Sequence, residues 1–169
     1  IWSKRDAPGI EIAYHGAGNE AWNTPVLISE TSNQSAVTQR SRAIINDGGE
    51  AAAIWLNKAD PESDVQLIFK SRSTEGVWSK SLVLRASRLI EMPALAFNNN
   101  GDILVTWQEM SPQGIFTIKG VYHHGATKTW SMVESYTSGI RHAGFAQPAL
   151  NADGNGLIYW RETDTPPVT

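Results

Sequence analysis

The chain of 169 residues contains no cysteine. This absence excludes disulfides, structural zinc sites built on thiolates and a cysteine nucleophile. No basic run is longer than Lys4-Arg5 and the formal net charge is −3, so the sequence has no electrostatic footprint for nucleic acid or an anionic membrane. No apolar stretch approaches the roughly 20 residues that cross a bilayer, and we therefore expect no membrane insertion.

Helical periodicity is missing as well. Short apolar segments alternate with turn residues (Gly, Asn, Asp and Ser) at intervals of about 8–12 residues, which is the all-β pattern. Hydrophobic residues make up 41% of the chain, enough to build a core. We expect antiparallel sheet with less than about a tenth of the chain in helix.

Tryptophan is abundant and evenly spaced. The seven tryptophans form two interleaved series, Trp2, Trp55, Trp107 and Trp160, and then Trp22, Trp78 and Trp130. The gaps are 53, 52 and 53 residues in the first series and 56 and 52 in the second. Self-similarity at a fixed period of roughly 40–50 residues indicates a repeat architecture, propellers among them.

A glycine stands six residues before three tryptophans of the first series. Gly49, Gly101 and Gly154 each end a turn rich in Asn, Asp or Gly, so we expect a hairpin there, with positive φ at the glycine. The segment between glycine and tryptophan is apolar at successive positions. Such a segment is typical of a strand that is covered on both faces. Each of these strands should end near its tryptophan.

A second hairpin completes each period. Its expected strands are Ile10–His15, Val65–Lys70 and Phe116–His123, returning through Trp22–Ser29, Trp78–Ser87 and Trp130–Tyr136. Four antiparallel strands per period describe a propeller blade, with strands A to D from inside out. We predict an all-β β-propeller segment of about three four-stranded blades. Its expected parts are a half-blade 1–35, blades 36–87 and 88–140, a half-blade 141–162 and a linker or tail 163–169.

Three blades are fewer than the usual 4–8 or so. Either a second chain completes a six-bladed ring as a homodimer, or the sequence belongs to a longer propeller. In the dimer, the A–B hairpin Pro148–Trp160 of each chain would complete the C–D hairpin of the other. Both arrangements would cover strand edges that otherwise lack partners.

Two segments carry a family resemblance. Residues 93–109 (PALAFNNNGDILVTWQE) and 147–162 (QPALNADGNGLIYWRE) resemble the repeats of bacterial sialidase-like β-propellers, near the Asp-box superfamily and more distantly the propeller lectins. The Asp-box windows are degenerate: only Ser71 and Trp78 fit in the first and only Trp130 in the second. The Arg-Ile-Pro signature of sialidases is missing and the arginines show no triad pattern. We therefore predict no catalytic residues and lean against an enzyme.

The position two residues after each first-series tryptophan is polar. A tryptophan face beside a carboxylate or amide suits a sugar, although tryptophans that merely fill the space between blades are the competing interpretation. The long loop 137–146 adds an arginine and a histidine. The candidate ligand-binding residues are Trp2, Trp55, Asn57, Trp107, Glu109, Trp160, Glu162, Arg141 and His142.

No metal or other cofactor is expected. The histidines at His15, His123 and His124 would lie on different blades, and the Asn/Asp turns are too short and too poor in carboxylates for calcium. We predict a non-catalytic binding module, with glycans bound at repeated inter-blade sites as the first ligand class. The alternatives are a protein-interaction or scaffolding propeller of a larger surface protein, and a divergent or inactive glycoside hydrolase. The cysteine-free, Asn/Ser/Thr/Gly-rich composition favours a secreted, periplasmic or cell-surface protein.

Overall fold

The computed structural model describes residues 2–3, 9–18, 20–29 and 37–165. These residues contain strands and turns but no helix, and every strand pair is antiparallel. The all-β prediction is confirmed for this part of the chain. Of the predicted tail 163–169, Thr163 is the last residue of a strand, and residues 166–169, with Pro166-Pro167, lie outside the described residues.

Two complete sheets form the middle of the molecule. The first has the order β4-β5-β6-β7, and its strands are Val37–Ile45, Ala51–Lys58, Val65–Arg72 and Leu82–Ser87. In the second, β8 (Ile90–Phe97), β9 (Ile103–Met110) and β10 (Phe116–His124) pair in sequence order. Two short strands, β11 (Thr129–Trp130) and β12 (Glu134–Ser135), both pair with β10 and divide its outer edge between them.

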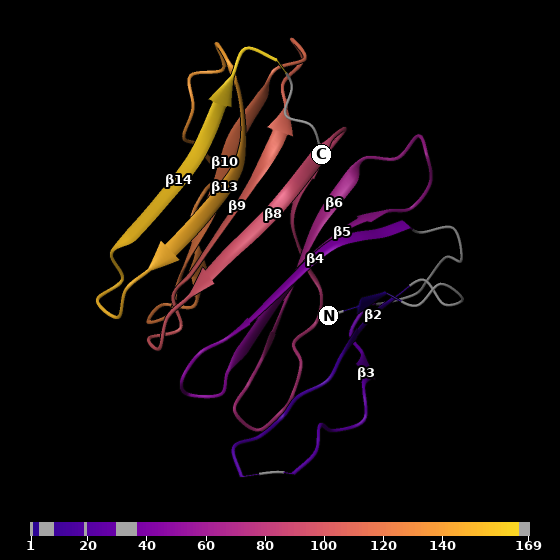
Figure 1. The fold of residues 1–169 in the computed structure, drawn as a ribbon, viewed down its shortest axis with the longest axis vertical. Coiled ribbons are helices and arrows are strands. Elements are labelled where there is room, and N and C mark those ends of the chain that lie inside the picture. The colour runs from indigo at the N-terminus through magenta and orange to yellow at the C-terminus, as the bar shows by residue number, and fades with distance from the viewer. Residues whose placement is uncertain (1, 4–8, 19, 30–36, 166–169) are drawn as a thin grey trace.

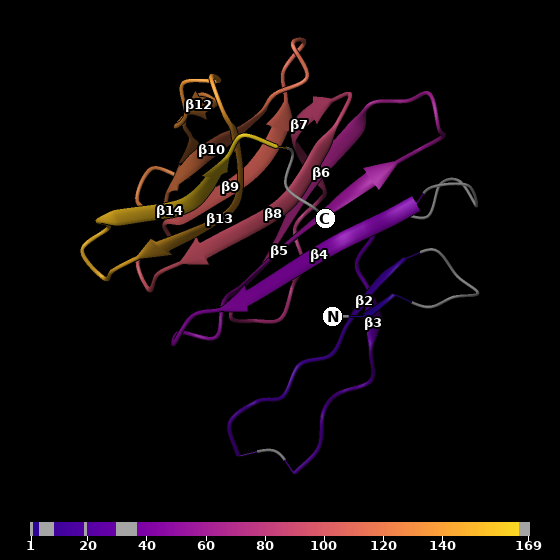
Figure 2. The same ribbon diagram turned by 45° about the horizontal axis from the view of Figure 1, so that its top comes forward.

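A smaller sheet flanks the pair at each end. At the N-terminal end β1 (Trp2–Ser3), β2 (Ile10–Ile12) and β3 (Val26–Leu27) pair in that order. At the C-terminal end β13 (His142–Leu150) pairs with β14 (Gly156–Thr163). Strand β8 lies between β4 and β13, so the first strands of successive sheets are neighbours (Figures 1 and 2). Among the described residues the sheets form an open array.

The core lies between the sheets. Successive side chains of a strand point to opposite faces of the sheet. In the second strand of each complete sheet both sets are buried, because a neighbouring sheet covers each face. In β5, Ala52 and Ile54 pack toward β9, whereas Ala53 and Trp55 pack toward β2 and Ile28. This two-sided burial was predicted from the continuous apolar pattern and is confirmed.

The hairpin turns have the predicted backbone. Gly49, Gly101 and Gly154 have φ of +82°, +81° and +83°, in the left-handed region that glycine adopts without strain. The strand after each turn continues three residues past its tryptophan, to Lys58, Met110 and Thr163. The polar residues two positions after these tryptophans are therefore strand residues.

A bulge that the sequence did not indicate recurs in the same hairpins. The strand register shifts between Gln39 and Arg42, between Glu91 and Ala94, and between Gly144 and Gln147. Inside these shifts, Arg40, Met92 and Phe145 have φ of +48°, +48° and +58°. These residues are 52 and 53 positions apart, so the bulge belongs to the repeat.

The predicted outer strands are partly wrong. Strands were expected to start at Trp22 and Trp78, but β3 starts at Val26 and β7 at Leu82, and β2 ends at Ile12 instead of His15. The reason is the residue after each tryptophan of the second series. Its side-chain oxygen accepts a hydrogen bond from a backbone N–H of the neighbouring strand and so replaces a backbone acceptor. The pairs are Asn23 with Tyr14, Ser79 with Ser71, and Ser131 with Tyr122.

Candidate functional site

The tryptophans proposed as sugar platforms are mostly inaccessible. Trp55 is 2% exposed and Trp107 is fully buried, because their strands are sandwiched between neighbouring sheets. Trp160 is 37% exposed, and the side chain of Trp2 lies outside the described residues. Stacking of a sugar on the buried Trp55 and Trp107 rings is therefore excluded in this arrangement, and the prediction of equivalent stacking sites in every repeat is corrected.

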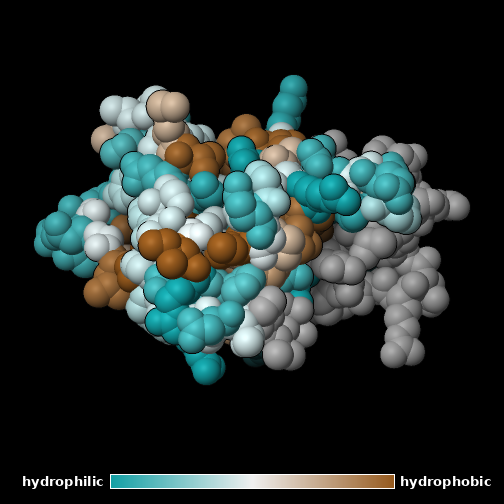
Figure 3. Space-filling model, turned by 90° about the horizontal axis from the view of Figure 1, so that it is seen from above, coloured by the Kyte–Doolittle hydropathy of each residue, from teal (hydrophilic) through white to brown (hydrophobic). Residues whose placement is uncertain are grey.

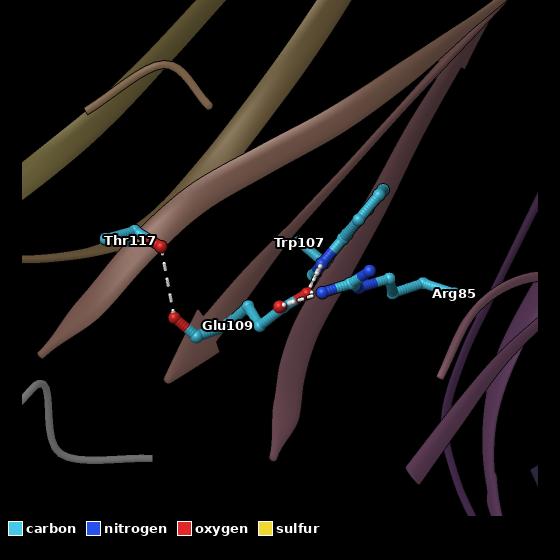
Figure 4. Close-up of polar contacts among 4 residues, drawn as sticks. All are labelled: Arg85, Trp107, Glu109 and Thr117. Carbon is cyan, nitrogen blue, oxygen red and sulfur yellow. Dashed lines mark hydrogen bonds and ion pairs between the residues drawn. The ribbon is translucent and has the colours of Figure 1, made fainter. Parts of the chain in front are cut away.

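Glu109 lies in a network that joins the two complete sheets (Figure 4). Arg85, on β7, donates from Nε to Oε2 of Glu109 at 2.9 Å and from Nη2 to Oε1 at 2.6 Å. Trp107 Nε1 donates to the same Oε2 at 3.0 Å. Thr117 Oγ1, on β10, donates to the backbone carbonyl of Glu109 at 3.2 Å. This bidentate geometry fixes the carboxylate and the guanidinium relative to each other.

The network determines the ionisation of the pair. Burial raises the pKa of the Glu109 carboxyl, but the hydrogen bonds from Arg85 and Trp107 and the charges of Arg85 and Lys119 outweigh it, and the pKa lies below its usual value. The hydrogen bond to Glu109 raises the pKa of Arg85. Both groups are therefore charged at neutral pH. Such a pair suits binding and positioning better than proton transfer.

The contact between tryptophan and carboxylate is itself part of the repeat. Trp160 Nε1 donates to Oε1 of Glu162 at 3.3 Å, as Trp107 does to Glu109. Asn57 holds the corresponding place after Trp55. Because the indole N–H already has its acceptor on the same strand, the Trp-x-Glu pattern has a structural explanation that requires no ligand.

A hollow of about 1030 Å³ opens beside the ion pair. It lies where β7 and β9 end and β8 and β10 begin, at the uppermost end of the molecule in Figure 1. Its charged lining consists of Arg85, Arg88, Lys119 and Glu109, with serine and threonine hydroxyls around them. We call it the inter-sheet cleft. Figure 3 views this end and shows a mainly hydrophilic face with separate hydrophobic patches.

Arg141 and His142 make contacts of their own, outside the Glu109 network. Arg141 Nε contacts Oδ1 of Asp164 at 2.9 Å, and both side chains are largely exposed. His142 is the first residue of β13 and not a loop residue, and its Nδ1 accepts a hydrogen bond from the backbone N–H of Phe116 at 3.3 Å. Neither residue lines the cleft. Arg141 and His142 therefore do not form one site with Glu109.

Arg85, Arg88 and Lys119 were not among the sequence-predicted residues. They come from β7, the connection to β8, and β10, which meet only because one sheet packs against the next. A repeat period places equivalent residues within a unit, but it does not show which residues of two neighbouring units face each other.

Within the described ranges no three His, Cys, Asp or Glu side chains gather as a potential metal site. The same part of the chain has no helix long and apolar enough to cross a membrane. Comparison with models of protein families, with curated proteins and with solved structures finds no match to this chain.

Proposed function

We propose that this chain is a segment of a β-propeller that acts as a non-catalytic binding module, and that the inter-sheet cleft binds an acidic glycan. The observation that carries this proposal is the charge of the cleft. Three cationic side chains and one carboxylate line it, in a chain whose net charge is −3. Glu109 neutralises Arg85, which leaves the charges of Arg88 and Lys119 for a ligand.

Three features support the propeller. The strands of each complete sheet pair in sequence order, the first strands of successive sheets are adjacent, and the same strand positions face the next sheet in each unit. Four-stranded antiparallel sheets related in this way are the units of propellers. The resemblance of residues 93–109 and 147–162 to sialidase-like repeats points in the same direction.

The chemistry of the cleft favours a sugar acid over a purely apolar ligand. Ser87, Ser111 and Thr117 offer hydroxyls, while Leu89 and Pro112 add apolar surface that can contact sugar C–H groups. A carboxylate on the ligand would lie near Arg88 and Lys119. The bidentate Arg85–Glu109 pair would then hold the two walls of the cleft in place and take no part in a reaction.

A glycan array tests the ligand class. The full chain should retain sialylated or uronic-acid-containing glycans and leave their neutral counterparts unbound, with retention that weakens as salt is raised because charges are screened. Equal retention of neutral and acidic glycans, or retention of neither, would contradict the proposal. Retention of protein ligands in place of glycans would favour the interaction-propeller alternative.

A further inference from the structure

The outward face of β14 is an uncovered copy of a surface that is buried in the two preceding units. Leu157 and Tyr159 are 60% and 62% exposed. Strand pairing identifies their equivalents: Leu157 pairs with Ala149 as Leu104 pairs with Ala96, and Tyr159 pairs with Gln147.

The equivalents on the other strands face the next sheet in the chain and are almost fully buried there. Leu104 and Thr106 on β9 are 4% and 0% exposed, and Ala52 and Ile54 on β5 are both 0% exposed. The face of β14 thus carries apolar side chains at positions that the repeat covers wherever a following sheet is present.

The complementary surface is uncovered at the other end of the array. On β8, Leu95 and Phe97 pack into the core shared with β5. Their equivalents on β4 are Ala43 and Ile45, since Ile45 pairs with Ala51 as Phe97 pairs with Ile103. Ala43 is exposed and Ile45 is 50% exposed. The two ends of the array therefore expose the two surfaces that pack against each other between successive sheets.

A ladder of asparagines gives this packing a direction. Asn46 Nδ2 donates to the backbone carbonyl of Asn98 at 3.2 Å, and Asn98 Nδ2 donates to the carbonyl of Asn151 at 3.0 Å. Asn46 and Asn98 are buried, whereas Asn151 is exposed. Among the described residues, Oδ1 of Asn151 accepts from the backbone N–H of Asn155, but its Nδ2 has only a long contact of 3.5 Å with Oδ2 of Asp153. The C-terminal end of the ladder presents a donor and the N-terminal end presents the Asn46 carbonyl.

We propose that the β13–β14 sheet of one chain docks on the outward face of β4 of a second copy of this chain, head to tail. Leu157 and Tyr159 would cover Ala43 and Ile45, and the Asn151 amide would donate to the Asn46 carbonyl of the second copy. The occupant is a second copy because the chain already makes this interface between its own successive sheets. The proposal depends on the repeat packing and not on the glycan site.

One strand must move for this contact to form completely. Trp2 of β1 pairs with Glu11 of β2, at the place where Trp107 of β9 pairs with Lys119 of β10. Trp160 of an incoming β14 would take that place beside β2. Strand β1 pairs through two residues only, so its displacement breaks a short ladder.

Sedimentation equilibrium of the full chain over a range of concentrations tests the proposal. We expect a dimer whose dissociation constant rises at least about tenfold in Tyr159→Glu and in Ile45→Lys, because each buries a charge in the interface. Met132→Glu is the matched control: Met132 is 87% exposed and lies on neither face, so its dimer should be unchanged. Circular dichroism melting should show all three variants folded.

Mixing the two interface variants separates this arrangement from others. A mixed pair of Tyr159→Glu and Ile45→Lys chains retains one native contact, between the unchanged β14 of one and the unchanged β4 of the other. The mixture should therefore dimerise more tightly than either variant alone. A wild-type monomer throughout the range would overturn the proposal. So would a dimer that Ile45→Lys leaves intact, since that outcome indicates β14 pairing with itself.

Discussion

The indole N–H of Trp107 donates a 3.0 Å hydrogen bond to the carboxylate of Glu109, two residues further along the same strand. From the sequence, the two side chains were predicted to hold a ligand together. They instead satisfy each other, and Arg85 completes the contact from the neighbouring sheet. The ring of Trp107 is core, and the carboxylate is one wall of the inter-sheet cleft.

Removing the Trp107 ring should therefore cost stability. We expect Trp107→Ala to lower the free energy of unfolding by about 3–5 kcal/mol, because it leaves a cavity between the sheets and removes the indole donor from the Glu109 carboxylate. Trp160→Ala should cost less, since Trp160 is 37% exposed. Denaturant unfolding measures both values. Equal losses for the two variants would contradict the different roles assigned to these tryptophans.

The Glu109 carboxylate should make stability depend on pH. Its pKa is lower in the folded chain than the ordinary 4.5, so the ionised form stabilises the fold at pH values above 4.5. That contribution is lost as pH falls through the folded-state pKa. Glu109→Gln should thus be less stable than the wild type at pH 7, by about 1–3 kcal/mol, and the difference should shrink below pH 4 or so. Unfolding curves from pH 3 to 7 test this; a difference that stays constant over the range would contradict it.

The recurring bulge makes a prediction about glycine. Phe145 has φ of +58°, where any side chain with a Cβ is strained. Phe145→Gly should be more stable than Phe145→Ala by about 1 kcal/mol, although both lose the ring. Ala149, on the same strand, has no positive φ, and Ala149→Gly should be destabilising. Thermal melts of the three variants decide this. A more stable Phe145→Ala would show that the left-handed backbone carries no strain.

The asparagine ladder should matter more than an exposed turn residue. Asn98 donates to Asp102 and to the Asn151 carbonyl and accepts from two backbone N–H groups. Asn98→Ala should cost about 2 kcal/mol or more, because buried backbone groups lose their partners. Asn155→Ala, at an exposed position, should change stability by less than about 0.5 kcal/mol. Chemical denaturation compares them, and equal effects would show that the ladder contributes nothing specific.

Local signals in the sequence account for the features that were predicted correctly. The Asn/Asp-Gly turns determine the hairpins and the positive φ of Gly101, and the apolar pattern of 103–107 determines burial on both faces. The period of 52 or 53 residues determines which strands are equivalent.

The features that were not predicted depend on contacts or on atypical residues. Arg40, Met92 and Phe145 adopt left-handed backbone although they are not Gly, Asn or Asp, the residue types that favour it. The oxygen of Ser79 interrupts an outer strand whose apolar pattern begins earlier. In the candidate site, Glu109 was found through its place after Trp107, but Arg85 joins it across the gap between two sheets, which no spacing within the repeat reveals.

Isothermal titration with 3′-sialyllactose and lactose tests the central claim most directly, because the two sugars differ in the acidic residue. We expect the wild-type chain to bind sialyllactose and to show no detectable heat with lactose. Lys119→Ala should weaken sialyllactose binding about tenfold, whereas Lys80→Ala, which removes an exposed lysine outside the cleft, should leave it unchanged. Binding of lactose and sialyllactose with equal affinity, or equal effects of the two lysine substitutions, would contradict an acidic-glycan site in the inter-sheet cleft.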